Sequence, residues 1–127
     1  MTLKILVVDD SRIMVKMMSA LLTKLGYQVV GTAENGQIAM NEYAQLLPDV
    51  VTMDISMPEM DGIEASKFIL GRFPDARIVM VTAMGQQQLV LNAMKMGVAG
   101  YVLKPIDEKK LATAINNAVK RRTESRW

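Results

Sequence analysis

The stretch Lys4-Ile5-Leu6-Val7-Val8-Asp9-Asp10-Ser11 leads from a short apolar run directly into two carboxylates and a serine. The run is rich in Ile, Leu and Val without strict alternation, as is typical of a strand covered on both faces. Ser11 can cap a helix, and Gly26 can supply the left-handed turn that ends it. The apolar face of this helix is expected to contain Met14, Met17, Leu21 and Leu25. The stretch therefore predicts a buried parallel strand, an acidic turn and a helix.

The same succession of an apolar run and a helical pattern recurs four more times along the chain. Further strands are expected at 27–33, 50–53, 78–81 and 101–103, and further helices at 37–47, 62–73, 86–96 and from Asp107 onward. Five strand–helix units imply right-handed crossovers, and hence parallel strands with helices on both faces of the sheet. We therefore predict a doubly wound α/β domain, while the periodicity alone leaves the order of the strands open.

Length and composition narrow the class of protein. The chain has 127 residues, of which 50% are hydrophobic and 22% charged, so we expect one globular domain. A formal net charge of +2 is too small to indicate direct binding of nucleic acid. Neither cysteine nor histidine is present, so any metal must be bound by oxygen. With no signal-peptide pattern and no run near the ~20 apolar residues of a membrane helix, we expect a soluble cytoplasmic protein without a membrane partner.

Polar side chains follow four of the five expected strands, at the point where each strand ends. They are Asp9, Asp10, Asp54, Thr82 and Lys104. The carboxyl ends of parallel strands lie along one edge of the sheet, so these side chains should converge there. Taken singly, each has an ordinary structural explanation, such as an aspartate that accepts hydrogen bonds in a turn or a lysine on the surface. Their conjunction indicates a chemical site.

Three carboxylates in one place require a compensating cation. Two carboxylates about 4 Å apart repel each other by roughly 4 kcal/mol at an effective dielectric constant of about 20. With only oxygen ligands available, Mg2+ is the favoured cation. Lys104 adds a second positive charge beside Asp54, which makes Asp54 a candidate nucleophile for in-line transfer of a phosphoryl group. Thr82 could then donate to a phosphoryl oxygen and shift the loop at 83–85.

Four ordered segments resemble the receiver domain of bacterial two-component response regulators, in particular the single-domain chemotaxis receivers. The segments are Val8-Asp9-Asp10-Ser11, Met53 to Gly62, Thr82-Ala83 and Lys104-Pro105. The resemblance extends from residue 3 to about residue 119 and implies a flavodoxin-like (βα)5 fold with strand order 2-1-3-4-5. It also implies that residues 1–121 form the receiver domain and residues 122–127 a short polar tail.

The resemblance implies which residues bind the metal and the phosphoryl group. Asp54 would accept a phosphoryl group from a histidine kinase. Asp10, Asp54 and the backbone carbonyl of Ser56 would ligate Mg2+, with Asp9 acting mainly through water. Lys104 would bind a phosphoryl oxygen, and its bond to the following proline would be cis.

The resemblance also implies roles in switching and in the lifetime of the phosphorylated form. Thr82 would bind a phosphoryl oxygen and move, and Tyr101 would be the aromatic residue that turns inward with it. An edge-strand tyrosine with its hydroxyl in water remains the alternative interpretation. Ser56 and Met84 lie two residues past Asp54 and Thr82, where the family tunes dephosphorylation, and Met84 could shield the acyl phosphate from water.

The resemblance implies a phosphorylation-dependent signalling switch and not a multiple-turnover enzyme. Its output surface would comprise the helix at 86–96, the strand at 101–103 and the last helix, where a downstream target protein docks. Leu91 points away from the core face of its helix and is expected on that surface. The loop at 83–87 is similar to that of some single-domain chemotaxis receivers, which favours the flagellar motor switch or a similar effector as the target.

Three other functions remain open at this point. The chain could be the receiver of a transcription regulator that lacks its DNA-binding domain, with the basic stretch at 120–123 as the start of a linker. It could be a phosphorelay intermediate without an output of its own. It could also be a magnesium-dependent phosphatase or phosphotransferase for small molecules, although the sequence offers no substrate pocket beyond the acidic edge.

Overall fold

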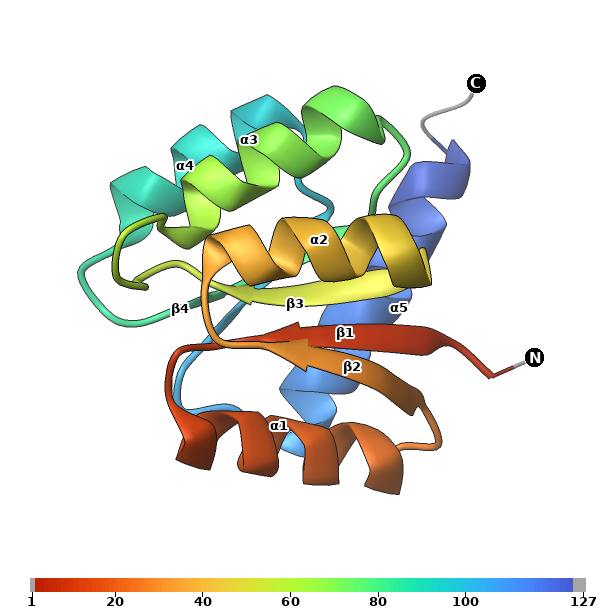
Figure 1. The fold of residues 1–127 in the computed structure, drawn as a ribbon. Helices are drawn as coiled ribbons and strands as arrows, with labels where there is room; N and C mark the ends of the chain where they lie inside the picture. Colours follow the sequence, from red (N-terminus) through yellow and green to blue (C-terminus); the bar gives the residue numbers. More distant parts are fainter. Residues whose placement is uncertain (1, 125–127) are drawn as a thin grey trace.

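A computed structural model describes residues 2–124, with side chains described for residues 2–120. Five parallel strands form one sheet in the order β2-β1-β3-β4-β5. Figure 1 shows β2, β1 and β3 side by side at the front of this sheet. The strands are β1 (Lys4–Val8), β2 (Gln28–Ala33), β3 (Val50–Asp54), β4 (Ile78–Thr82) and β5 (Gly100–Leu103). Both the parallel sheet and the strand order of the flavodoxin-like fold are confirmed.

Five helices cover the two faces of the sheet. They are α1 (Arg12–Lys24), α2 (Gly36–Leu46), α3 (Gly62–Arg72), α4 (Gln87–Met96) and α5 (Glu108–Glu124). Helices α2, α3 and α4 pack on one face and α1 and α5 on the other (Figure 1). Neighbouring residues of β1 therefore enter different cores, because Leu6 faces the first set of helices and Val7 the second. This two-sided burial explains why the strand sequences lack polar alternation.

The predicted helix ends follow from side-chain and glycine caps. The Ser11 hydroxyl accepts the N–H of Met14 at 3.3 Å at the start of α1, and Gly26 follows α1 with a φ of 92°. Asp107 accepts the N–H of Lys110 at 2.8 Å at the start of α5. Gly97 ends α4 with a φ of 108°. The caps predicted for α1 and α5 are thus confirmed.

The predicted apolar face of α1 is confirmed at Leu21 and Leu25, which pack partly buried against the core, and is wrong at Met17. Met17 is 50% exposed, whereas Met18 and Leu22 are buried against the sheet. A shift of one position turns a helix face by about 100°. Because the chain carries apolar pairs at 17–18 and 21–22, two neighbouring stripes have the same period and the pattern does not separate them. On α4, by contrast, Leu91 is 55% exposed, as predicted.

The C-terminal helix is longer than the boundary predicted for the receiver domain. Helix α5 continues through Glu124, so residues 122–124 prolong it, and the rest of the predicted tail lies outside the described residues. Among the described residues, every helix is too short or too polar to span a membrane.

Candidate functional site

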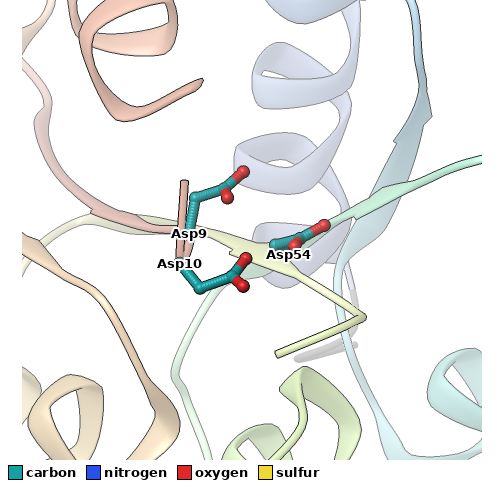
Figure 2. Close-up of side chains that lie close together, drawn as sticks. All are labelled: Asp9, Asp10 and Asp54. Carbon is teal, nitrogen blue, oxygen red and sulfur yellow. The ribbon is translucent and has the colours of Figure 1, made fainter. Parts of the chain in front are cut away.

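Three aspartates gather at the carboxyl edge of β1 and β3. Asp9 and Asp10 follow β1, and Asp54 ends β3; Figure 2 shows their carboxylates close together. One carboxylate oxygen from each lies within 4.8 Å of the others. Asp9 and Asp54 are each only 6% exposed, whereas Asp10 is exposed. The predicted convergence of the three carboxylates is confirmed.

Strand register and local hydrogen bonds hold the acidic cluster in place. Val8 pairs with Met53, so the residues that follow them, Asp9 and Asp54, emerge side by side. The Asp9 carboxylate accepts the N–H of Ser11 at 2.9 Å, which turns the chain from β1 into α1. The acidic turn and the start of the helix are therefore one structural unit.

The start of α3 approaches the end of β3 without any room for a side chain. Gly62 donates its N–H to the carbonyl of Ile55 at 2.8 Å. A Cβ on Gly62 would lie only 2.0 Å from the carbonyl oxygen of Asp54, which is backbone and has little freedom to move. Glycine at this position keeps α3 against the segment that carries Asp54.

Lys104 is the cation that faces the acidic cluster. Its Nζ lies 3.3 Å from Oδ1 of Asp54, and its backbone N–H donates to the carbonyl of Thr82 at 2.8 Å. The peptide bond between Lys104 and Pro105 is cis, as predicted. The prediction that Lys104 lies beside Asp54 is thus confirmed.

Burial dominates the ionisation of the cluster. The pKa of Asp54 is raised to about 6, mainly by burial and also by the charge of Asp9, while Lys104 opposes the rise. Burial also raises the pKa of Asp9, against the lowering effects of the Ser11 N–H and of Lys104. Within the described part of the chain, three carboxylates, two of them buried, thus face the ammonium of Lys104, and ionising all three is unfavourable unless a further cation is bound.

The donor set fits Mg2+. All three side chains offer carboxylate oxygens, the type of ligand that a hard divalent cation prefers. Asp10 is exposed and leaves the cluster open to water, which suits an ion that keeps part of its hydration shell. Ser56 lies two residues past Asp54 in the loop after β3, and the part of its carbonyl in the ligand set stays a prediction.

Thr82, at the end of β4, carries the predicted hydroxyl. This hydroxyl is hydrogen-bonded to Gln86, which was not predicted as a site residue. Thr82 is 3% exposed, and its hydroxyl donates to Oε1 of Gln86 at 3.1 Å. Gln86 Nε2 in turn donates to Oγ of Ser56 at 2.8 Å. This contact joins two loops that are 30 residues apart in the sequence, and no local pattern predicts it.

Tyr101 and Met84 line a cavity beside Thr82. The cavity has a volume of about 390 Å³, and its wall also includes residues of α4 and β5. Tyr101 is 53% exposed and Met84 is 83% exposed. The inward turn of Tyr101 and the shielding by Met84 stay predictions, although the cavity adjoins both Thr82 and the tyrosine ring.

Comparison with known proteins identifies the family. Residues 5–116 match the response regulator receiver domain. Chemotaxis protein CheY of Thermotoga maritima is 44% identical over 117 residues, which span 92% of this chain and 98% of that protein. A response regulator receiver domain protein from Clostridium thermocellum has a crystal structure that matches with a TM-score of 0.89 and 30% identity, over 95% of this chain and 97% of that one. The CheX-CheY-BeF3-Mg+2 complex from Borrelia burgdorferi matches with a TM-score of 0.85 and 34% identity, over 89% of this chain and 86% of that one. The chain, with its acidic cluster at the carboxyl edge of the sheet, therefore belongs to the response regulator receiver domain family.

Proposed function

We propose that the chain is a phosphorylation-dependent switch of a two-component system, in which Asp54 accepts a phosphoryl group from a histidine kinase in the cytoplasm. The observation that carries the proposal is the position of Asp54. Its buried carboxylate lies beside two further carboxylates, and its Oδ1 is 3.3 Å from the ammonium of Lys104. Membership of the receiver family supports the same chemistry.

The transfer itself is an in-line displacement on phosphorus. A carboxylate oxygen of Asp54 forms a bond to phosphorus while the bond from phosphorus to the histidine nitrogen of the kinase breaks, and that nitrogen keeps the bonding electrons. With a pKa of about 6, Asp54 is mostly ionised at neutral pH and available as the nucleophile. Lys104 lies close enough to Asp54 to stabilise the negative charge on the transferred oxygens.

The acidic cluster provides the metal ligands for this reaction. Asp10, Asp54 and the backbone carbonyl of Ser56 would hold Mg2+, and Asp9 would act through water. When bound, Mg2+ neutralises charge on the phosphoryl oxygens. The buried Asp9 also keeps the Ser11 N–H engaged at 2.9 Å, which maintains the shape of the turn around the ligands.

Phosphorylation would reach the output surface through the end of β4. The hydroxyl of Thr82 would move to a phosphoryl oxygen, and Tyr101 would turn into the cavity that lies beside it. The surface of α4, β5 and α5 changes in consequence, with exposed Leu91 on it. The similarity to a chemotaxis protein over most of both chains supports a motility-type target, such as a flagellar motor switch. The chain would dephosphorylate itself slowly and would not turn over external substrates.

An intact-mass experiment tests the acceptor. We expect the parent to gain the mass of one phosphoryl group from acetyl phosphate with Mg2+, and to gain none when the metal is removed with EDTA. Asp54→Asn should gain none under either condition. Asp61→Asn is the matched control, because Asp61 caps α3 by accepting the Glu64 N–H at 2.8 Å and asparagine can do the same. Equal phosphorylation of Asp54→Asn, or no gain in the parent, would overturn the proposal.

A further inference from the structure

The side chain of Gln86 is bonded at both ends of its amide. Gln86 immediately precedes α4, yet its side chain does not cap this helix. Oε1 accepts the hydroxyl of Thr82 at 3.1 Å and the N–H of Ala83 at 2.7 Å. Nε2 donates to Oγ of Ser56 at 2.8 Å. One side chain thus connects the loop after the phosphoryl acceptor with the loop that transmits the signal.

Two donors that converge on one oxygen resemble the environment of an anion. The hydroxyl of Thr82 and the N–H of Ala83 come from the end of β4, next to the strand that ends in Asp54. A phosphoryl oxygen on Asp54 would be a stronger acceptor for such donors than a neutral amide, because it carries charge. In the unmodified chain, the amide oxygen of Gln86 takes this role.

The two acceptors compete for a single proton. A threonine hydroxyl has one hydrogen to donate, so Thr82 cannot serve Gln86 and a phosphoryl oxygen at the same time. The other contact of this hydroxyl, with the carbonyl of Ala83, is longer at 3.3 Å. Release of Thr82 from Gln86 must therefore accompany any bond between Thr82 and the phosphoryl group.

We propose, on the basis of the proposed function, that Gln86 is a positioning residue that acts as a latch on Thr82. Its amide substitutes for the phosphoryl oxygen and holds the end of β4 in the unphosphorylated arrangement, with Ser56 as its anchor. A ligand that binds only the released arrangement has an apparent affinity that is reduced by the fraction of molecules in that arrangement. The latch thus lowers the tendency of the chain to activate and sets the threshold of the switch.

Titration with beryllofluoride in the presence of Mg2+ tests the latch, with fluorine NMR to detect the bound mimic. Gln86→Leu keeps the size of the side chain but removes both hydrogen-bonding groups, and we expect it to bind beryllofluoride roughly fivefold more tightly than the parent. Gln88→Leu is the matched control, because Gln88 is exposed on α4 and its amide donates to the nearby Asn92. The control should bind as the parent does. Ser56→Ala, which removes only the anchor, should give a smaller gain in the same direction.

A second pair of variants shows whether Gln86 acts through Thr82. In a Thr82→Val background, most of the gain from Gln86→Leu should disappear. Unchanged or weaker binding by Gln86→Leu, or the full gain persisting without the threonine hydroxyl, would overturn the latch alone. A parent that binds no beryllofluoride would instead overturn the proposed function, and the latch with it.

Discussion

At the scale of single residues, the carboxyl of Asp54 couples the chemistry of the site to the stability of the fold. Burial and the charge of Asp9 raise its pKa from 3.8 to about 6. Between these values the folded protein holds a proton that the unfolded chain releases, so its stability falls as the pH rises. Without Mg2+, the protonated Asp54 gives its full contribution to the stability of the fold below about pH 4. This contribution decreases as the pH rises and is lost above about pH 6. The shift corresponds to roughly 3 kcal/mol in the free energy of unfolding.

Urea unfolding in EDTA, between about pH 4 and pH 7, measures this coupling. The parent should lose stability across the range, whereas Asp54→Asn, which removes the titrating charge, should give a flatter profile. Asp61→Asn should keep the slope of the parent, since it leaves the acidic cluster intact. Mg2+ added at neutral pH should stabilise the parent more than Asp54→Asn. Equal slopes in the parent and Asp54→Asn would contradict the prediction.

At the scale of elements, α3 contains two glycines in opposite environments. A Cβ on Gly62 would meet the backbone oxygen of Asp54 at 2.0 Å, whereas one on Gly71 would meet nothing within 4 Å. Gly62→Ala should therefore destabilise the fold by roughly 1–3 kcal/mol, because the backbone has to shift. Gly71→Ala, in the same helix, should stabilise it by about 0.5–1 kcal/mol through the higher helix propensity of alanine. Urea unfolding of both variants checks this, and changes of the same sign would contradict it.

Local features of each element, and the meeting of side chains at the strand ends, could be predicted from the sequence, whereas other contacts between elements could not. Ser11 and Asp107 were predicted as caps because a cap depends on residues three positions apart. The apolar face of α1 was wrong at Met17, because only packing against the sheet decides between two equivalent stripes. Gln86 was not predicted, since its partner Ser56 is 30 residues away. Sequence periodicity therefore predicts the helices and strands, whereas residues that support the site through tertiary contacts, such as Gln86, are seen only in the structure.

At the scale of the whole molecule, the site forms because parallel strands end along one edge. This rule brought Asp9, Asp54 and Lys104 together from the sequence alone, once the strands were recognised as parallel. The strand order came from the resemblance to the receiver family and not from periodicity. The two edges of the sheet are then unequal, because the cavity lies beside β4 and the edge strand β5, whereas β2 forms the opposite edge.

This asymmetry predicts where the molecule responds to activation. Beryllofluoride with Mg2+ should slow hydrogen exchange in the loop at 83–87 and in β5, because Thr82 and Ala83 gain a charged acceptor and Tyr101 packs into the cavity. Exchange in β2, at the opposite edge, should stay the same. Thr82→Val should still bind Mg2+ at the acidic cluster but lose the change in β5, since the hydroxyl that transmits it is gone. Equal slowing in β2 and β5 would show a general stabilisation of the fold in place of a signal directed through β4.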